Sequence, residues 1–134
     1  MSLKYLLDTD TCIYITKQKP ARVLEKFETL SLGEIGISVI TYGELVYGAH
    51  KSHQAQKTLH LLDKLVELIP PLPIPIETGK YYGKVRRELE KTGKIIGNND
   101  LWIAAHALAM DLVLVTNNER EFSRVLDLKI ENWV

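Results

Sequence analysis

Short apolar runs alternate with longer amphipathic stretches along this chain. The short runs predict strands over residues 4–7, 35–39, 70–75, 112–115 and 129–133. The longer stretches carry apolar residues at helical spacing and predict helices over residues 9–17, 22–30, 41–50, 54–68, 77–91, 101–110 and 118–125. Because strands alternate with helices, we expect an α/β fold with a parallel β-sheet of about five strands flanked by helices. One domain covering residues 1–134 fits this pattern.

Two segments stand out within the pattern. Residues 112–115 are uninterrupted apolar, which is typical of a central parallel strand covered on both faces. Residues 70–75 contain alternating prolines that cannot donate to a central ladder. We therefore expect this proline segment at the sheet edge, either as a strand or as an extended connector.

The composition limits the classes of function. Lys plus Arg and Asp plus Glu both number 17, so the formal net charge is zero and any nucleic-acid contact must come from a local patch. The sequence has no apolar run near the roughly 20 residues of a membrane span. Cys12 is the single cysteine, which excludes an internal disulfide and fits a cytoplasmic protein.

Four polar residues are expected along one edge of the sheet. Asp8 ends the first predicted strand, and Glu44 lies in the first turn of the helix after the second. Asp100 begins a helix that runs directly into residues 112–115, and Asn118 follows that strand. Helices that follow parallel strands start at the carboxyl edge, and helices that precede them end at the amino edge. The topology therefore brings these four residues to the carboxyl edge, where α/β proteins bind ligands.

Each of these residues alone has a structural explanation. Glu44 matches a capping box with Thr41, Asp8 and Asp100 suit helix N-termini, and Asn118 suits an N-cap with Glu121 three residues on. Together, however, three carboxylates at one edge repel one another. A divalent cation removes that repulsion, and oxygen ligands favour Mg²⁺ or Mn²⁺ over zinc.

Other reactive side chains fit recognised chemistry poorly. Cys12 lies on an apolar helix face and has no histidine at motif spacing. His50 and His53 lack the spacing and the glutamate of a zinc-binding helix. His106 lies in an alanine-rich apolar helix and is expected in the core or at an interface.

Several motifs, in this order, resemble those of a PIN domain, specifically a VapC toxin of a type II (VapBC) toxin–antitoxin pair. The segments that carry the resemblance are Leu6-Leu7-Asp8-Thr9-Asp10, Ile40-Thr41-Tyr42-Gly43-Glu44-Leu45, Ile96-Gly97 with Asp100-Leu101 and Ile103-Ala104-Ala105-His106, Leu114-Val115-Thr116-Asn117-Asn118, and Ile130-Glu131-Asn132-Trp133. The resemblance covers essentially the whole chain and implies a metal-dependent endoribonuclease that hydrolyses phosphodiester bonds.

The resemblance also assigns roles to individual residues. Asp8, Glu44 and Asp100 match the acids of the family, as catalytic groups and as ligands of Mg²⁺ or Mn²⁺. Asn118 stands where many members have a fourth, acidic ligand. Three alternatives follow: the second metal position is weak, it is filled by Glu119, or it is reached through water. Three hydroxyl residues are expected to orient the carboxylates, namely Thr9, Ser38 and Thr116.

Partners follow from the same resemblance. Five basic residues are candidates for RNA phosphate contacts, with a solvated helix face as the alternative: Lys84, Arg86, Arg87, Lys91 and Lys94. The implied substrate is structured RNA, with initiator transfer RNA suggested by the subgroup. The implied protein partner is a VapB-type antitoxin that lies in a groove near the site. Candidates for its lining are Tyr14, Tyr42, Tyr47 and the apolar part of the helix over residues 54–68, with plain core packing as the alternative for each. A homodimer or a toxin–antitoxin hetero-oligomer is expected.

Two other functions compete with the nuclease. Asp8-x-Asp10 at a strand end also suits a haloacid-dehalogenase-type phosphatase, with Asp8 as nucleophile and Asp10 as general acid, although Cys12 departs from that motif. The other alternative is a module that binds RNA or protein without cleavage. In the nuclease interpretation, Asp10 is a helix-start residue beside the metal.

Overall fold

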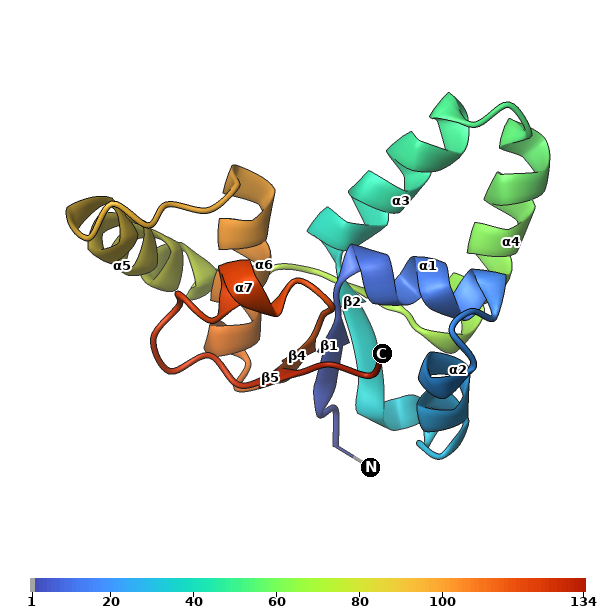
Figure 1. Cartoon of the computed structure of the whole chain (residues 1–134), viewed down its shortest axis with the longest axis horizontal. Helices are drawn as coiled ribbons and strands as arrows, with labels where there is room; N and C mark the ends of the chain where they lie inside the picture. The colour runs from blue at the N-terminus through green and yellow to red at the C-terminus, as the bar shows by residue number, and fades with distance from the viewer. Residues whose placement is uncertain (1) are drawn as a thin grey trace.

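A parallel five-stranded sheet forms the centre of the molecule (Figure 1). The computed structural model describes residues 2–134. The strand order is β3-β2-β1-β4-β5, with β1 in the middle. The strands are β1 (Tyr5–Leu7), β2 (Ile35–Ser38), β3 (Pro71–Leu72), β4 (Val113–Val115) and β5 (Ile130–Glu131). The predicted fold class is confirmed, and the proline segment forms the edge strand β3, as expected.

Helices cover both faces of the sheet. The helices α1 to α4 gather on one side in Figure 1, and α5, α6 and α7 on the other. Their bounds are α1 (Thr9–Lys17), α2 (Ala21–Glu28), α3 (Val39–Lys51), α4 (Ala55–Leu68), α5 (Thr78–Lys91), α6 (Asn98–Ala109) and α7 (Glu119–Phe122), with a short 3₁₀ turn at Leu32–Glu34. Among residues 2–134, no helix is long and apolar enough to cross a membrane.

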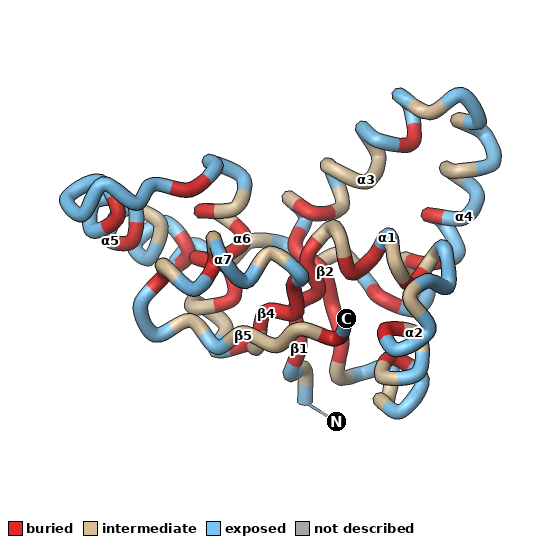
Figure 2. The backbone as a smooth tube through the Cα atoms, viewed as in Figure 1, coloured by how far each residue is buried: buried red, intermediate tan, exposed pale blue. Residues whose placement is uncertain are grey.

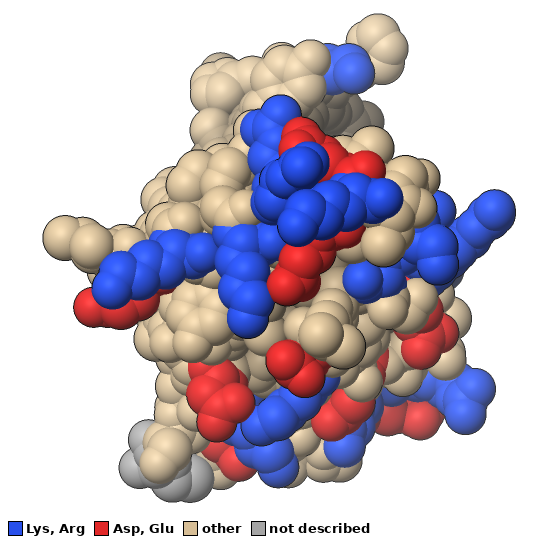
Figure 3. All heavy atoms as spheres, turned by 90° about the vertical axis from the view of Figure 1, so that its left-hand side faces the viewer, with Lys and Arg blue, Asp and Glu red and all other residues tan. Residues whose placement is uncertain are grey.

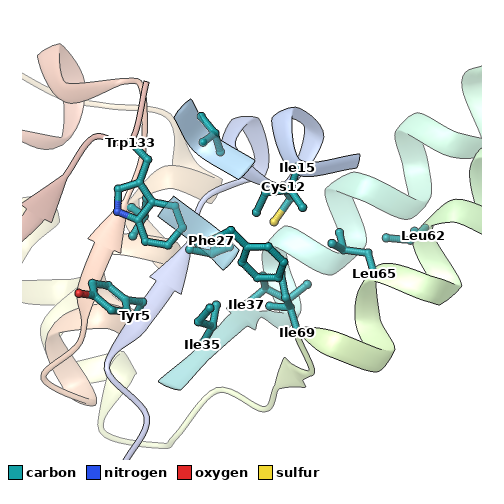
Figure 4. Packing of buried hydrophobic residues seen from close by; sticks show 13 residues of the cluster. Tyr5, Cys12, Ile15, Phe27, Ile35, Ile37, Leu62, Leu65, Ile69 and Trp133 are labelled. Carbon is teal, nitrogen blue, oxygen red and sulfur yellow. The ribbon is translucent and has the colours of Figure 1, made fainter. Parts of the chain in front are cut away.

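The two faces of the sheet carry separate hydrophobic clusters, and β1 contributes to both. Tyr5 and Leu7 point into the cluster with α1, α2 and α4, whereas Leu6 points into the cluster with α5, α6 and Phe122. Figure 2 shows the buried residues concentrated along the strands. Figure 4 shows the first cluster, in which Tyr5 meets Trp133 edge to face with ring centroids 5.6 Å apart. Full burial of a side chain such as Leu7 contributes about 1.5–3 kcal/mol, so the strand that ends at Asp8 is firmly anchored.

The start of α3 differs from the prediction. The helix begins at Val39 because the Ser38 hydroxyl accepts a hydrogen bond from the Ile40 amide at 3.2 Å and caps the first turn. Thr41 therefore lies inside the helix, buried, with no hydrogen-bond partner for its hydroxyl among residues 2–134. The predicted capping box between Thr41 and Glu44 is wrong, and Glu44 lies in the second helical turn.

Candidate active site

Asp8 lies at the carboxyl end of β1 and is held from two sides. Its Oδ1 accepts from the Thr9 amide at 2.8 Å, and its Oδ2 accepts from the Thr116 hydroxyl at 2.8 Å. The side chain is almost buried. Burial, followed by the charge of Asp10, raises the pKa of Asp8 to about 6, while the two hydrogen bonds oppose the shift. The carboxylate is thus fixed in place at an energetic cost.

Asp100, in the first turn of α6, shares an electrostatic environment with Asp8. Burial, followed by the charges of Asp8, Glu121 and Glu44 and a hydrogen bond to Glu121, raises the pKa of Asp100 to about 7. The Asp8 carboxylate has the largest effect of these charges. The structure therefore brings Asp8 and Asp100 together at the sheet edge from distant parts of the chain, as the topology predicts.

Glu44 reaches the same edge from α3. Its Oε1 accepts from the Thr9 hydroxyl at 2.6 Å, and its Oε2 accepts from the Asn99 side-chain amide at 3.5 Å. Thr9 thereby contacts two of the three acids, Asp8 through its amide and Glu44 through its hydroxyl. The geometry of Thr9 and Thr116 is the one expected of groups that orient carboxylates.

Ser38 does not contact a carboxylate. Its hydroxyl caps α3 and lies 2.9 Å from Nδ1 of His106, which is fully buried. The expectation that Ser38 orients the acids is therefore wrong, because the early start of α3 directs its side chain into the core. His106 is a core residue, one of the two positions that its sequence context allows.

The fourth acidic position also differs from the expectation. The Asn118 side chain donates to the Glu121 carboxylate instead of capping α7, and Glu121 also accepts from the Gly97 amide at 3.4 Å. Glu119 accepts from the Asn132 side chain at 3.0 Å, away from Asp100. The acid next to Asp100 is therefore Glu121, which the sequence presents only as the partner of an N-cap.

Asp10 has a structural environment of its own. Its Oδ1 accepts from the Thr11 amide at 2.6 Å and its Oδ2 from the Asn117 amide at 3.1 Å. The bond from Asn117 joins the start of α1 to the loop after β4, and the bond from Thr11 lies within α1. Asp10 thus serves as the helix-start residue that the nuclease interpretation expects, and both of its oxygens already have partners.

The acidic cluster offers donor atoms of the type that divalent cations bind. Asp8, Glu44 and Asp100 offer only carboxylate oxygens, and their mutual repulsion is a cost that a bound cation would relieve. Within residues 2–134, no three acidic, histidine or cysteine side chains lie in an arrangement that could hold a metal ion as it stands. Oxygen donors of this kind are the ones that hard divalent cations take in proteins, together with waters.

An apolar groove of about 320 Å³ opens beside Glu44 between α1, α3 and α4. Its lining includes Ile13, Leu45, Leu61 and Leu65. The three tyrosines expected there are elsewhere: Tyr14 and Tyr42 pack against the core, and Tyr47 is exposed on α3. Only the α4 part of the predicted lining is correct.

The remaining predicted residues lie away from the acids. The five basic residues are exposed on α5 and on the loop that follows it, namely Lys84, Arg86, Arg87, Lys91 and Lys94. Cys12 is fully buried in the first cluster, and burial raises the pKa of its thiol far above the usual range. A nucleophilic role for Cys12 is therefore excluded.

Comparison with known proteins shows to which family the chain belongs. Residues 5–127 match the family model of the PIN domain. The chain is 41% identical to Ribonuclease VapC2 of Haemophilus influenzae over 132 residues, covering 98% of this chain and 99% of that relative. The chain belongs to the VapC ribonucleases of the PIN-domain family. It is also 41% identical to the tRNA(fMet)-specific endonuclease VapC of Shigella flexneri, covering 98% of both chains.

Solved structures give the same result for this PIN domain. VapBC2 from Rickettsia felis, bound to a DNA fragment from their promoter, superposes with a TM-score of 0.92 at 38% identity and covers 98% of this chain and 100% of that one. The predicted family and the nuclease activity are thereby confirmed, and the phosphatase interpretation is not favoured. VapC nucleases of the PIN family, to which the chain belongs, generally depend on a divalent metal.

Proposed function

We propose that this PIN domain hydrolyses RNA with Mg²⁺ or Mn²⁺ held by Asp8, Asp100 and Glu44. The observation that carries the proposal is the convergence of these three acids at one sheet edge, where the charges of the other two raise the pKa of Asp100. Acids that only cap helices gain nothing from lying close together, because their carboxylates repel one another. Metal ligands gain from lying close together, because a cation between them turns the repulsion of the carboxylates into attraction to the cation.

The cation and the side chains around the acids have separate roles in the proposed reaction. When bound, the cation supplies Lewis-acid stabilisation of the phosphate charge and lowers the pKa of a water. Thr116 and Thr9 fix Asp8 from two sides, and Thr9 fixes Glu44, so that these carboxylates do not reorganise during the reaction. Asn118 and the Gly97 amide hold Glu121 next to Asp100, and we assign the fourth acidic position to Glu121 in place of Asn118 or Glu119.

For the substrate, we propose a structured RNA such as initiator transfer RNA. The basic residues of α5 supply phosphate contacts that carry no sequence information. A small domain without a sequence-reading module suits an RNA loop whose bases are already unstacked. The Shigella flexneri relative, named for its specificity towards tRNA(fMet), supports the same substrate class.

For the protein partner, we propose a VapB-type antitoxin that neutralises the nuclease. Relatives at 38% identity form VapBC complexes in Rickettsia felis and Salmonella typhimurium. Thr9 and Glu44 are part of the lining of the apolar groove between α1, α3 and α4, so an antitoxin segment in it would reach Glu44. A homodimer or a toxin–antitoxin hetero-oligomer is the proposed assembly. The cytoplasm is the proposed compartment, since the RNA substrate is there and Cys12 is a free thiol.

The test compares Asp100→Asn with Asp10→Asn on transfer RNA in Mg²⁺. Loss of the metal-facing carboxylate is expected to reduce cleavage by about 10³-fold, because metal charge stabilisation amounts to several kcal/mol. Asp10→Asn is expected to stay within a few-fold of the wild type, because its amide oxygen still accepts a backbone N–H. A phosphatase would show the opposite order on a phosphomonoester. Cleavage by Asp100→Asn at the wild-type rate would rule out the proposed site.

A further inference from the structure

An aromatic pair joins α5 to α6, the helix that carries Asp100. Tyr82 of α5 and Trp102 of α6 stack with ring centroids 3.9 Å apart and planes inclined by 13°. Both side chains are only partly buried. Tyr82 packs against the second hydrophobic cluster, whereas Trp102 belongs to neither cluster within the described range 2–134. The core therefore gives no reason for a tryptophan at this position of α6.

Hydrogen bonds connect this pair to the start of α6. The Tyr82 hydroxyl donates to the Asn98 side-chain oxygen. Asn99 donates to Glu44, and Asp100 is the next residue of the same helical turn. The first residues of α6 thus connect the aromatic pair, through Asn98, with the acids, through Asn99 and Asp100.

Positive charge adjoins the same pair. The Arg86 guanidinium donates to the Tyr82 hydroxyl at 2.8 Å and lies 6.0 Å from the Tyr82 ring centre. Arg86 is exposed, and its ion pair with Glu90 at 3.3 Å is also at the surface. Figure 3 looks at the side of the molecule that carries α5 and shows Lys and Arg side chains across it, with acidic side chains between them.

We propose that Tyr82 and Trp102 form a stacking platform for one unpaired base of the RNA, next to the phosphate that is cut. An aromatic ring beside basic side chains is the arrangement that holds single-stranded nucleic acid, because every base has a face that stacks and every nucleotide carries a phosphate. Arg86 would bind a phosphate on the same strand. Trp102 and Tyr82 are positioning residues: they place the nucleotide, and the acids carry out the chemistry.

This proposal rests on the proposed ribonuclease function and explains how the site selects its substrate. A base held on the platform must be out of the helical stack, so paired RNA would be excluded and a loop would be accepted. The platform therefore favours RNAs that present a loop, without reading which base occupies it.

The experiment measures binding and cleavage of a short RNA hairpin with 2-aminopurine placed at each loop position in turn. The full-length Trp133→Phe protein serves as the background, so that Trp102 is its one tryptophan. At one loop position, we expect binding to quench both the 2-aminopurine and the Trp102 fluorescence. An RNA that is abasic at that position is expected to raise KM about tenfold with little change in kcat, as the value of one stacked base implies.

Variants separate stacking from a structural role. Trp102→Leu is expected to raise KM about tenfold on the intact RNA and to show no further loss on the abasic RNA, whereas Trp102→Phe recovers most of the affinity. Tyr81→Leu is the matched control, because Tyr81 is the neighbouring aromatic on α5 and lines a different hollow with Val85 and Leu126. Its KM is expected to stay unchanged.

Two results would overturn the platform. Equal KM values of the wild type for intact and abasic RNA at every loop position would do so, as would an additional loss of Trp102→Leu on the abasic RNA. In both cases, continued cleavage by the wild type leaves the ribonuclease function intact. Absence of cleavage by the wild type, with quenching retained, would instead remove the nuclease assignment alone.

Discussion

Two charged regions of the molecule differ in how far their side chains are buried. The acidic edge consists of Asp8, Glu44 and Asp100, and the basic flank consists of the Lys and Arg residues of α5. At the edge, the charge is buried: Asp8 is 6% exposed, receives two hydrogen bonds and has a pKa of about 6. On the flank, the charge is exposed, and its ion pairs join Glu90 to Arg86 at 3.3 Å and to Arg87 at 3.9 Å. Exposed pairs of this kind contribute at most about 1 kcal/mol each. The edge is therefore built for chemistry at fixed positions, and the flank for attraction that tolerates movement.

Of the substitutions that test this contrast, one that removes a hydrogen bond to Asp8 is expected to have the largest effect. Thr116→Val deletes the hydroxyl that donates to Asp8 Oδ2 and preserves the volume of the side chain. Metal affinity and cleavage are expected to fall by about 10- to 100-fold, as for other residues that orient metal ligands. Isothermal titration with Mn²⁺ and initial cleavage rates measure the two quantities. Thr116→Ser restores the hydroxyl and should restore both; an active Thr116→Val protein would show that Asp8 needs no such support.

An intermediate effect is expected on the free energy of unfolding, because burial and the neighbouring acids raise the pKa of Asp100. The pKa of Asp100 is about 7 in the folded protein, above its ordinary value of 3.8, so between these values the folded state holds a proton that the unfolded state has lost. Stability that is present at low pH is therefore lost as the pH rises from about 4 to above 7. Without metal at pH 8, Asp100→Asn is expected to be more stable than the wild type by about 1–2 kcal/mol after allowance for solvent screening.

Urea unfolding in chelator at about pH 5 and about pH 8 measures this difference. The gain should shrink by more than half at the lower pH, where the wild-type carboxyl is still protonated when folded. Asp63→Asn is a suitable control, because Asp63 is exposed on α4. A gain of equal size at both pH values would mean that the effect of the substitution does not come from charge.

The smallest effect is expected on the flank. Lys84→Glu with Arg87→Glu should weaken RNA binding by a few-fold and should lower the slope of log K against log salt by about one for each phosphate that is no longer bound. The rate of cleavage at saturating RNA should not change, since neither residue approaches the acids. Filter binding over a salt series gives the slope, and Lys57→Glu on α4 is the matched control. An unchanged slope would mean that this face is only a solvated helix surface.

The sequence predicts the edge well because topology decides which strand and helix ends meet. Asp8, Glu44 and Asp100 follow from strand order alone, without knowledge of any side-chain contact. Glu121 could not be predicted in this way, because it reaches Asp100 through the packing of α7 against Gly97, which is distant in the chain. The prediction for Ser38 was wrong for a local reason: α3 begins two residues before Thr41, because Ser38 itself caps the first turn.

For the basic flank, the sequence predicts where the residues lie but not how the aromatic side chains pack. The positions of the basic residues on α5 are correct from helical spacing, yet their sequence gives no sign of the Tyr82–Trp102 stack. Trp102 belongs to an apolar run that predicts a buried helix, and most of that helix is buried. Only the packing of α5 against α6 leaves this one ring beside a tyrosine at the surface.

The central place of β1 has a consequence for local opening of the molecule. This strand pairs with β2 on one side and β4 on the other, and the Asp8 amide donates to the Val115 carbonyl at 2.8 Å. Amides of such a strand open only when most of the protein unfolds, so the protons of Leu6 and Leu7 should be among the last to exchange with solvent. Asp8, whose carboxyl group has a raised pKa, thus follows directly on the strand that opens least. The loops and helices around it can open locally while Asp8 stays in place.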